Sequence, residues 1–156
     1  NEISAGSIVC TTVNSSGSFF SIKVFEDIGG FDEGLFIDHV ETEWCFRAKK
    51  RGYELYATNK VELEHLMGDD VLVYSILGKK KFMPYRSPLR HRYLFRNSIA
   101  LLKRDYIPFI WKFYCLIKLT YTCFVFTLFS NEKLDQLKAI SLGLRDGVKG
   151  GEGKIK

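Results

Sequence analysis

Residues 29–48 contain the densest group of side chains that could take part in chemistry. Within twelve of these residues the sequence places six acidic or imidazole side chains: Asp32, Glu33, Asp38, His39, Glu41 and Glu43. Carboxylates and imidazoles transfer protons and bind divalent metal ions. A loop with a purely structural role rarely needs so many such groups, so we expect a functional site here.

Glu41 stands at the start of a helix expected over residues 39–51, with Gly52 as its terminator. The positive end of the helix dipole stabilises a carboxylate in this position. Such a group suits a general base that removes a proton from an alcohol. A glutamate that only compensates the helix dipole is the alternative, and spacing alone favours this structural role.

His65 is the candidate metal ligand, at the end of a strand expected over residues 61–66. Imidazole binds Mn²⁺ and similar divalent ions, and strand ends are places where sheets present ligands. A lone surface or core histidine is the alternative. Asp38 and His39 are weaker candidates of the same kind.

Five arginines surround a later helix that begins at Ser87-Pro88: Arg86, Arg90, Arg92, Arg96 and Arg104. Arginines at helical spacing could bind phosphate, and a solvated basic helix face is the alternative. Nucleic-acid binding has no recognised motif here to support it.

The elements expected to position these groups are of mixed α/β type. We expect a buried strand over residues 4–13, a short helix over Ile22–Ile28, the helix over 39–51, strands over 53–57 and 61–66, and a mobile loop over 67–81. Val40, Trp44 and Ala48 should form the buried stripe of the helix over 39–51. Glu43 and Arg47 should form an ion pair on its exposed side.

The C-terminal part reads as helical. A helix over 87–104 is followed by an apolar segment over 106–129, a last amphipathic helix to about residue 148, and a frayed tail over 150–154. The apolar segment is long enough to span a bilayer by length alone. Because Lys112 and Lys118 interrupt it, a membrane-interfacial helix fits better, and packing on a partner domain is the alternative.

The whole-chain composition narrows the class of protein. The net charge is +5, with acidic residues concentrated between 26 and 70 and basic residues later in the chain. This asymmetry predicts that the functional site lies in the acidic part of the chain. It also predicts a basic surface suited to anionic lipid or a phosphate-bearing ligand. The four cysteines form no Cys-x-x-Cys pair, which argues against a zinc ribbon and for a reduced compartment.

An ordered series of motifs resembles the C-terminal half of family 2 inverting glycosyltransferases, most closely the bacterial rhamnosyltransferase-like branch. The motifs are GGFDE at 29–33, LFID at 35–38, VETEWCFRA at 40–48 and KRGY at 50–53, with SAGS at 4–7, His65 and YLFRN at 93–97. The resemblance covers roughly residues 4–105.

The resemblance implies the acceptor-side half of a GT-A domain, a Rossmann-like α/β fold, over residues 1–105, followed by a helical, membrane-interfacial extension over 106–156. It implies Glu41 as the catalytic base, where most relatives have Asp, and His65 as a ligand of Mn²⁺ or Mg²⁺. It also implies substrate-binding roles, which we assign to Gly6, Ser7, Asp38, Trp44 and Arg96.

The same resemblance implies transfer of a sugar, with rhamnose as a candidate, from a nucleotide-sugar donor to a glycan or lipid-linked acceptor, with inversion, in bacterial surface polysaccharide synthesis. The chain has no Asp-x-Asp triplet, the metal motif that ends the donor-side half. We therefore expect part of a longer enzyme that is inactive alone, cytoplasmic, and peripheral on the inner face of the plasma membrane. Because a lone half-domain exposes a sheet edge, a second copy of the chain is a further candidate partner, in a homodimer. The alternative function is a non-catalytic membrane-peripheral or assembly module.

Overall fold

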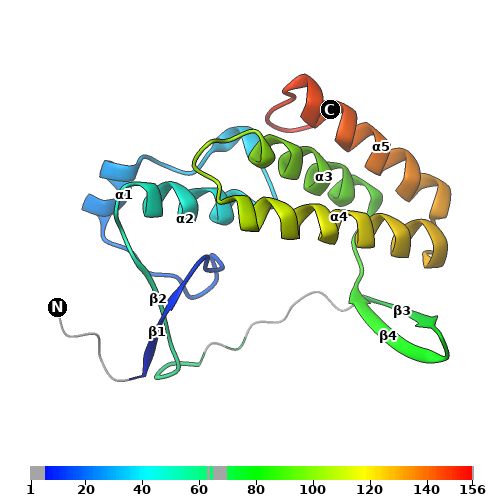
Figure 1. Ribbon diagram of the computed structural model, residues 1–156, viewed down its shortest axis with the longest axis horizontal. Coiled ribbons are helices and arrows are strands. Elements are labelled where there is room, and N and C mark those ends of the chain that lie inside the picture. Colours follow the sequence, from blue (N-terminus) through cyan, green and yellow to red (C-terminus); the bar gives the residue numbers. More distant parts are fainter. Residues whose placement is uncertain (1–5, 63, 65–69, 156) are drawn as a thin grey trace.

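The computed structural model describes residues 6–62, 64 and 70–155 (Figure 1). In this part the chain is mixed α/β, with two small antiparallel sheets and five α-helices. The elements in order are β1 (Ser7–Cys10), α1 (Ile22–Ile28), the 3₁₀ turn η1 (Glu33–Leu35), α2 (Val40–Lys50), β2 (Leu55–Thr58), β3 (Val71–Ile76), β4 (Lys79–Pro84), α3 (Pro88–Leu102), α4 (Phe109–Phe129) and α5 (Lys133–Lys149).

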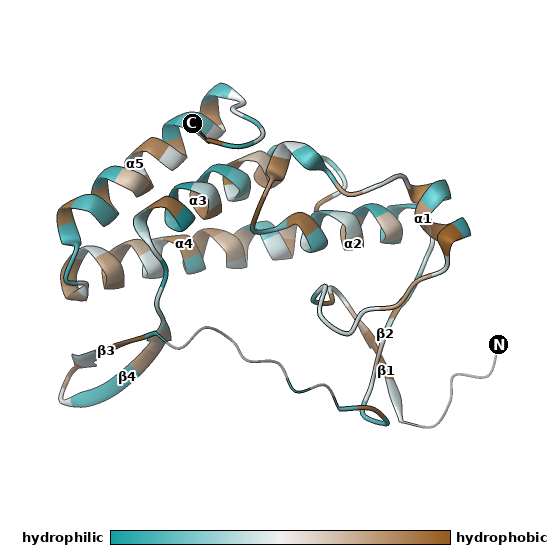
Figure 2. Cartoon of the chain, turned by 180° about the vertical axis from the view of Figure 1, so that it is seen from behind, coloured by the Kyte–Doolittle hydropathy of each residue, from teal (hydrophilic) through white to brown (hydrophobic). Residues whose placement is uncertain are grey.

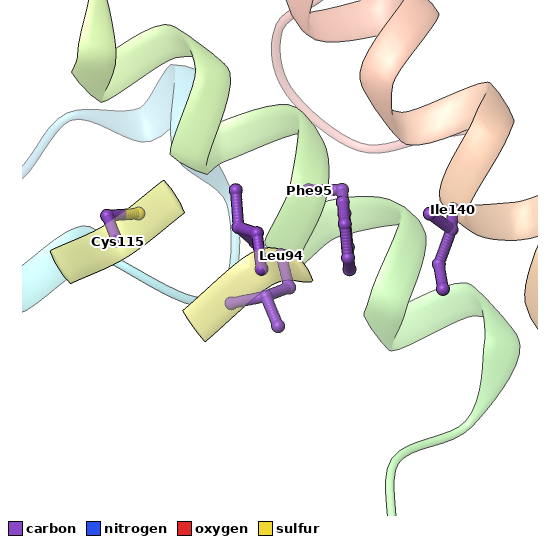
Figure 3. Close-up of a cluster of buried hydrophobic side chains, with 5 residues drawn as sticks. Leu94, Phe95, Cys115 and Ile140 are labelled. Atoms are coloured by element: carbon purple, nitrogen blue, oxygen red, sulfur yellow. The ribbon is translucent and has the colours of Figure 1, made fainter. Parts of the chain in front are cut away.

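Helices α3, α4 and α5 lie side by side and build the largest part of the core (Figure 1). Leu94 and Phe95 of α3 pack with Cys115 of α4 and Ile140 of α5 (Figure 3). Helix α3 begins as its sequence predicts. The Ser87 hydroxyl accepts a hydrogen bond from the Arg90 amide, and Pro88 occupies the first turn, where its missing N–H costs nothing.

Two glycines allow α5 to approach α3 very closely. A Cβ atom on Gly143 would lie 2.5 Å from the Arg92 carbonyl oxygen, and one on Gly147 would lie 2.7 Å from the Arg96 carbonyl oxygen. Real Cβ atoms do not approach oxygen this closely, so both positions require glycine. The four-residue spacing puts both glycines on one face of α5.

Helices α1 and α2 pack through the predicted stripe. Trp44 and Ala48 are buried against Ile28, and Val40 is partly buried in the neighbouring cluster. Helix α1 has the predicted bounds, and Gly29 ends it with a φ of 89°. Helix α2 joins the bundle through Phe46, which contacts Leu101 of α3 and Trp111 of α4.

Strands β1 and β2 form an antiparallel ribbon in which Ser7 pairs with Thr58 and Cys10 with Leu55. The Cys10 end of the ribbon is tied to α2, because the Lys49 Nζ donates to the Cys10 carbonyl at 3.3 Å. Ile8 and Val9 remain 70% and 58% exposed, so the predicted burial of the strand over 4–13 is wrong for these residues of the chain.

The predicted mobile loop over 67–81 is wrong for its described residues, because 71–84 form the hairpin β3–β4. Leu77 and Gly78 make the tight turn with φ values of 51° and 74°, the left-handed pair that twists two strands together. Tyr74 anchors the hairpin to α4 by packing against Val125 and Phe126.

Two further predictions fail. Residues 61, 62 and 64 of the predicted second strand are not in a strand, and its remaining residues lie outside the described part. The tail after α5 is not frayed. Gly153 N–H donates to the Gly34 carbonyl at 2.6 Å, and Ile155 N–H donates to the Tyr93 hydroxyl at 2.7 Å.

Candidate active site

The segment that leads into α2 has an unusual backbone. Phe36, Asp38 and His39 all have positive φ values, of 58°, 62° and 65°. Side chains with a Cβ atom rarely adopt this region, because the Cβ crowds the neighbouring carbonyl. His39 is the N-cap of α2 and supplies no side-chain cap. The entry into the helix is therefore set by contacts from elsewhere in the chain.

Those contacts come from two adjacent residues of α3. The Asn97 Nδ2 donates to the carbonyls of Leu35 at 2.8 Å, Ile37 at 2.7 Å and Asp38 at 3.0 Å. The Arg96 Nη2 donates to the carbonyls of Gly34 at 3.1 Å and Leu35 at 3.0 Å. Both side chains are about 1% exposed.

Asp38 and His39 are each held by a partner on α3. The guanidinium of Arg90 faces the Asp38 carboxylate at 3.3 Å, and Asp38 is nearly buried. The His39 Nε2 lies 2.9 Å from the Ser98 hydroxyl. The pKa of His39 is lowered to about 4, chiefly by burial. The charges of Lys118 and Arg86 also lower it, whereas those of Asp38 and Glu41 raise it. At neutral pH the imidazole is therefore uncharged.

Glu41 lies in the first turn of α2, half-buried, beside this neutral imidazole. Within residues 6–62, 64 and 70–155, its carboxylate makes no hydrogen bond or ion pair. The first-turn position places it near the amide ends of the helix, which favour negative charge. Among the described residues, the arrangement thus leaves the Glu41 carboxylate without a partner, as a general base requires.

Glu43 has a quite different environment: the predicted ion pair with Arg47 is confirmed, but its predicted exposure is wrong for Glu43. Its side chain is 1% exposed. Arg47 binds both carboxylate oxygens, at 3.0 and 2.9 Å, Arg104 Nη1 lies 3.0 Å from Oε1, and the Tyr106 hydroxyl donates to the same oxygen. Burial and the hydrogen bond to Glu43 raise the pKa of Tyr106 to about 12.

Because a helix turns about 100° per residue, Glu41 and Glu43 project from nearly opposite sides of α2. A hollow of about 530 Å³ opens on the Glu43 side, lined by Gly30, Phe31, Asp32, Glu33, Gly34, Glu43, Arg47, Arg104 and Tyr106. Asp32, Arg104, Glu43 and Arg47 form a chain of ion pairs along it, whereas Glu33 is exposed. Asp32 also accepts a hydrogen bond from the Gly34 amide at 2.9 Å. This side of α2 is a structural network.

The predicted basic helix face is also largely engaged inside the protein. Arg92 binds Asp146 of α5 at 2.7 Å, and Arg104 binds Asp32. Arg90 and Arg96 make the contacts described above. A solvated row of arginines on α3 is therefore not what the structure shows.

Of the remaining predicted substrate-binding residues, Trp44 lies on α2 three positions after Glu41, and the other two lie at the β1–β2 ribbon. Gly6 and Ser7 are at the start of β1, the end of the ribbon farther from α2 (Figure 1). Trp44 is buried with Phe20, Phe25 and Phe31, and its indole N–H donates to the Gly29 carbonyl at 2.9 Å. The binding roles of this set stay predictions.

The metal site also stays a prediction. His65 lies outside the described residues. Among residues 6–62, 64 and 70–155, no three or more histidine, cysteine or carboxylate side chains gather in a way that could hold a metal ion. The described residues alone therefore supply no complete set of protein ligands for a divalent ion.

Sequence comparison relates this chain to the glycosyltransferases. One relative is the dTDP-rhamnosyl transferase RfbF of Shigella flexneri, which is 33% identical to this chain over 137 residues. The match covers 87% of this chain and 45% of the relative, so the chain spans less than half of the relative's length. Neither a protein-family model nor a solved structure matches the chain.

Sequence reasoning named Arg90 and Arg96 only as candidates for binding phosphate or substrate, and it missed Ser98 and the contacts that shape the site from α3. Arg90 and Ser98 lie more than fifty positions from the residues that they bind, Asp38 and His39. Helical spacing offered one signal, because positions 90, 94, 97 and 98 share a face of α3. The sequence alone gave no indication that this face meets the segment before α2.

Proposed function

We propose that this chain is the acceptor-side part of an inverting nucleotide-sugar glycosyltransferase, with Glu41 as its catalytic base. The observation that carries the proposal is the contrast between two neighbouring carboxylates. Glu43 is buried and fully paired, whereas Glu41 is half-buried, unpaired among the described residues, and next to an uncharged imidazole. Similarity to a dTDP-rhamnosyl transferase supports the reaction class.

The reaction needs one base on the acceptor side. The Glu41 carboxylate takes the proton of an acceptor hydroxyl as its oxygen attacks the anomeric carbon. The new glycosidic C–O bond forms while the bond from that carbon to the donor phosphate breaks. The nucleoside diphosphate leaves with the electron pair, and attack from the opposite face inverts the anomeric configuration.

The donor and acceptor are proposed from the relative's name and from the resemblance. The name supports dTDP-rhamnose as the first donor to test. A glycan or lipid-linked sugar is the acceptor class, in bacterial surface polysaccharide synthesis. His65, with Mn²⁺ or Mg²⁺, remains the proposed metal ligand, and an ion bound there would offset the charge of the leaving diphosphate.

The described fold is compatible with a part of a GT-A domain over residues 1–105. The β1–β2 ribbon has only two strands in the described part, and it exposes Ile8 and Val9. Exposed apolar side chains and unpaired strand edges are typical of a surface that another part of a sheet covers. A donor-binding half of the full-length protein is the proposed occupant, and a second copy of the chain is the alternative.

The test is sugar transfer by the full-length protein carrying Glu41→Gln, with dTDP-rhamnose and a lipid-linked acceptor. We expect kcat to fall by about a hundredfold or more, because the base is lost while its shape is kept. Glu33→Gln is the matched control, since Glu33 is an exposed carboxylate of the same segment. Undiminished transfer by Glu41→Gln would remove Glu41 from the mechanism.

The proposed inactivity of the chain by itself is tested separately. Residues 1–156 are assayed alone and with a donor-binding half supplied in trans. We expect transfer only in the second mixture. Strong transfer by residues 1–156 alone would show that the donor site lies within this chain.

A membrane-peripheral role is the second candidate, and α4 supports it. This helix is long and apolar enough to cross a membrane by length and composition, with a mean hydropathy of 1.4 over its best window. Only 28% of that window is buried, and apolar colour runs along the helix (Figure 2). An exposed apolar row follows one side: Phe109, Ile110, Phe113, Ile117, Tyr121, Phe124 and Leu128.

We propose that this row lies in the interface of the inner leaflet of the plasma membrane, with the protein on the cytoplasmic side. Lys118 is exposed on α4, and Lys79, Lys80 and Lys81 are exposed on the hairpin packed against it. Such lysines favour anionic headgroups.

Flotation with anionic vesicles should fail for Phe113→Gln/Ile117→Gln but succeed for the control Phe19→Gln. Equal flotation of the wild type and both variants would exclude α4 as the membrane contact.

A further inference from the structure

The segment 34–39 holds a backbone conformation that its own residues do not favour. Three side chains with Cβ atoms adopt left-handed φ values within four positions. Such residues persist only where the surrounding structure holds them, and they gather at functional sites. The segment also lacks a local cap, because the His39 side chain makes no bond to the first turn of α2.

One pair of side chains supplies hydrogen bonds to the carbonyl groups along this segment, beside the contacts of Arg90 with Asp38 and of Ser98 with His39. Asn97 and Arg96 together bind the carbonyls of Gly34, Leu35, Ile37 and Asp38. The Arg96 Nε donates to the Asn97 Oδ1 at 2.9 Å, which fixes the orientation of the amide so that its NH₂ group faces the segment. The two side chains therefore act as one unit.

The C-terminal tail completes this unit. The Arg96 Nη1 donates to the Gly153 carbonyl at 2.6 Å, and Gly153 N–H reaches the Gly34 carbonyl. The Arg96 guanidinium also lies over the Tyr93 ring, 5.0 Å from its centroid. All three guanidinium nitrogens are thus engaged inside the protein. In this arrangement Arg96 has little capacity left for a substrate phosphate.

We propose that Arg96 and Asn97 are positioning residues for Glu41. They hold the left-handed segment, the segment sets where α2 begins, and Glu41 lies in the first turn of that helix. This inference rests on the proposed function for the role of Glu41. Its structural part, that the pair fixes the segment, can be tested without any activity.

The variant of choice is Asn97→Asp in the full-length protein. It keeps the size of the side chain but replaces the NH₂ donor by an oxygen that faces three carbonyl oxygens. Asn97→Ser serves if the aspartate variant does not fold. Asn131→Asp is the matched control, because Asn131 is exposed. Ile140→Val, in the core at α5, controls for a general loss of stability.

The first measurement is hydrogen–deuterium exchange of residues 34–43. We expect exchange there to be at least about tenfold faster in Asn97→Asp than in the wild type. Neither control should change it relative to the rest of the chain. Unchanged exchange of residues 34–43 in the Asn97 variant would overturn the proposal.

The second measurement is the split between kcat and KM. Misplacing the base should lower kcat by about tenfold or more and leave the donor KM within about twofold. A kcat loss in Ile140→Val as large as that in Asn97→Asp would reduce the pair to a structural role. If Glu41→Gln retains full transfer, the proposed function fails while the exchange result still decides whether the pair fixes the segment.

Discussion

Arg104 Nη1 lies 3.0 Å from the Glu43 Oε1, so a residue just beyond α3 neutralises a carboxylate in the middle of α2. The Tyr106 hydroxyl, 63 positions after Glu43 in the sequence, donates a hydrogen bond to the same oxygen. These contacts fix α2 to α3 on the side opposite Glu41. They explain why two glutamates that resemble each other in sequence should respond differently to substitution.

Glu43→Gln should destabilise the protein by about 3 kcal/mol, because it leaves two partly buried guanidinium groups without their counter-charge. Glu41→Gln should cost only about 0.5 kcal/mol, the value of a carboxylate at a helix start. Urea unfolding of both variants checks the difference. Equal losses would show that Glu43 is not the structural partner.

The protein should lose stability as the pH falls from about 6.5 towards 4, the window set by the lowered pKa of His39. In that window the unfolded imidazole binds a proton and the folded one does not, so protonation favours the unfolded state. Well above pH 6.5 the His39 imidazole is neutral in both the folded and the unfolded protein, so stability no longer depends on its protonation. The loss from this residue should be about 3 kcal/mol at pH 4.

His39→Asn should flatten this pH dependence, since asparagine tolerates the left-handed backbone and does not titrate. A residual slope should remain because burial also lowers the pKa of His91. Unfolding curves between pH 7 and pH 4 provide the comparison. An unchanged slope would mean that His39 is protonated in the folded protein.

Gly143→Ala should destabilise the protein by about 2 kcal/mol although alanine is the better helix former. The added methyl group would meet the Arg92 carbonyl oxygen and push α5 away from α3. Ser141→Ala, at an exposed position of the same helix, is the control. The melting temperatures of the two variants give the answer, and a stabilised Gly143→Ala protein would contradict the close approach.

Leu77→Asn should stabilise the hairpin β3–β4 by about 0.5–1 kcal/mol. Leu77 has a φ of 51° and a side chain that is 96% exposed, so the turn loses no packing when it is replaced. Asparagine followed by Gly78 is the favoured pair for this turn. A lower melting temperature in Leu77→Asn would contradict the turn assignment.

Elements with local signals could be predicted from the sequence. Ser21 and Gly29 bracket α1 with the observed bounds, and Ser87-Pro88 begins α3. The hairpin β3–β4 could not be predicted, because leucine is an unusual residue for a left-handed turn position and the lysine run resembles a loop. The sequence was therefore sufficient to predict an element only where residues next to it mark its first or last turn.

The site was predicted in part for the same reason. The first-turn position of Glu41 follows from the helix start, which is a local signal. The burial of Glu43 and the restraint by Asn97 depend on partners about sixty positions away. Spacing within one helix contains no information about such partners, so only the folded chain reveals them.

The contact of the C-terminal tail with Arg96 limits how chimaeric and tagged versions of this protein can be designed. Exchanging residues 106–156 for the matching part of another enzyme would replace the Gly153 carbonyl, which is an acceptor for the side chain that holds the segment before α2. A purification tag fused close to Ile155 would crowd its bond to Tyr93. Chimaeras and tagged proteins should therefore keep residues 143–155 native and place a spacer after them.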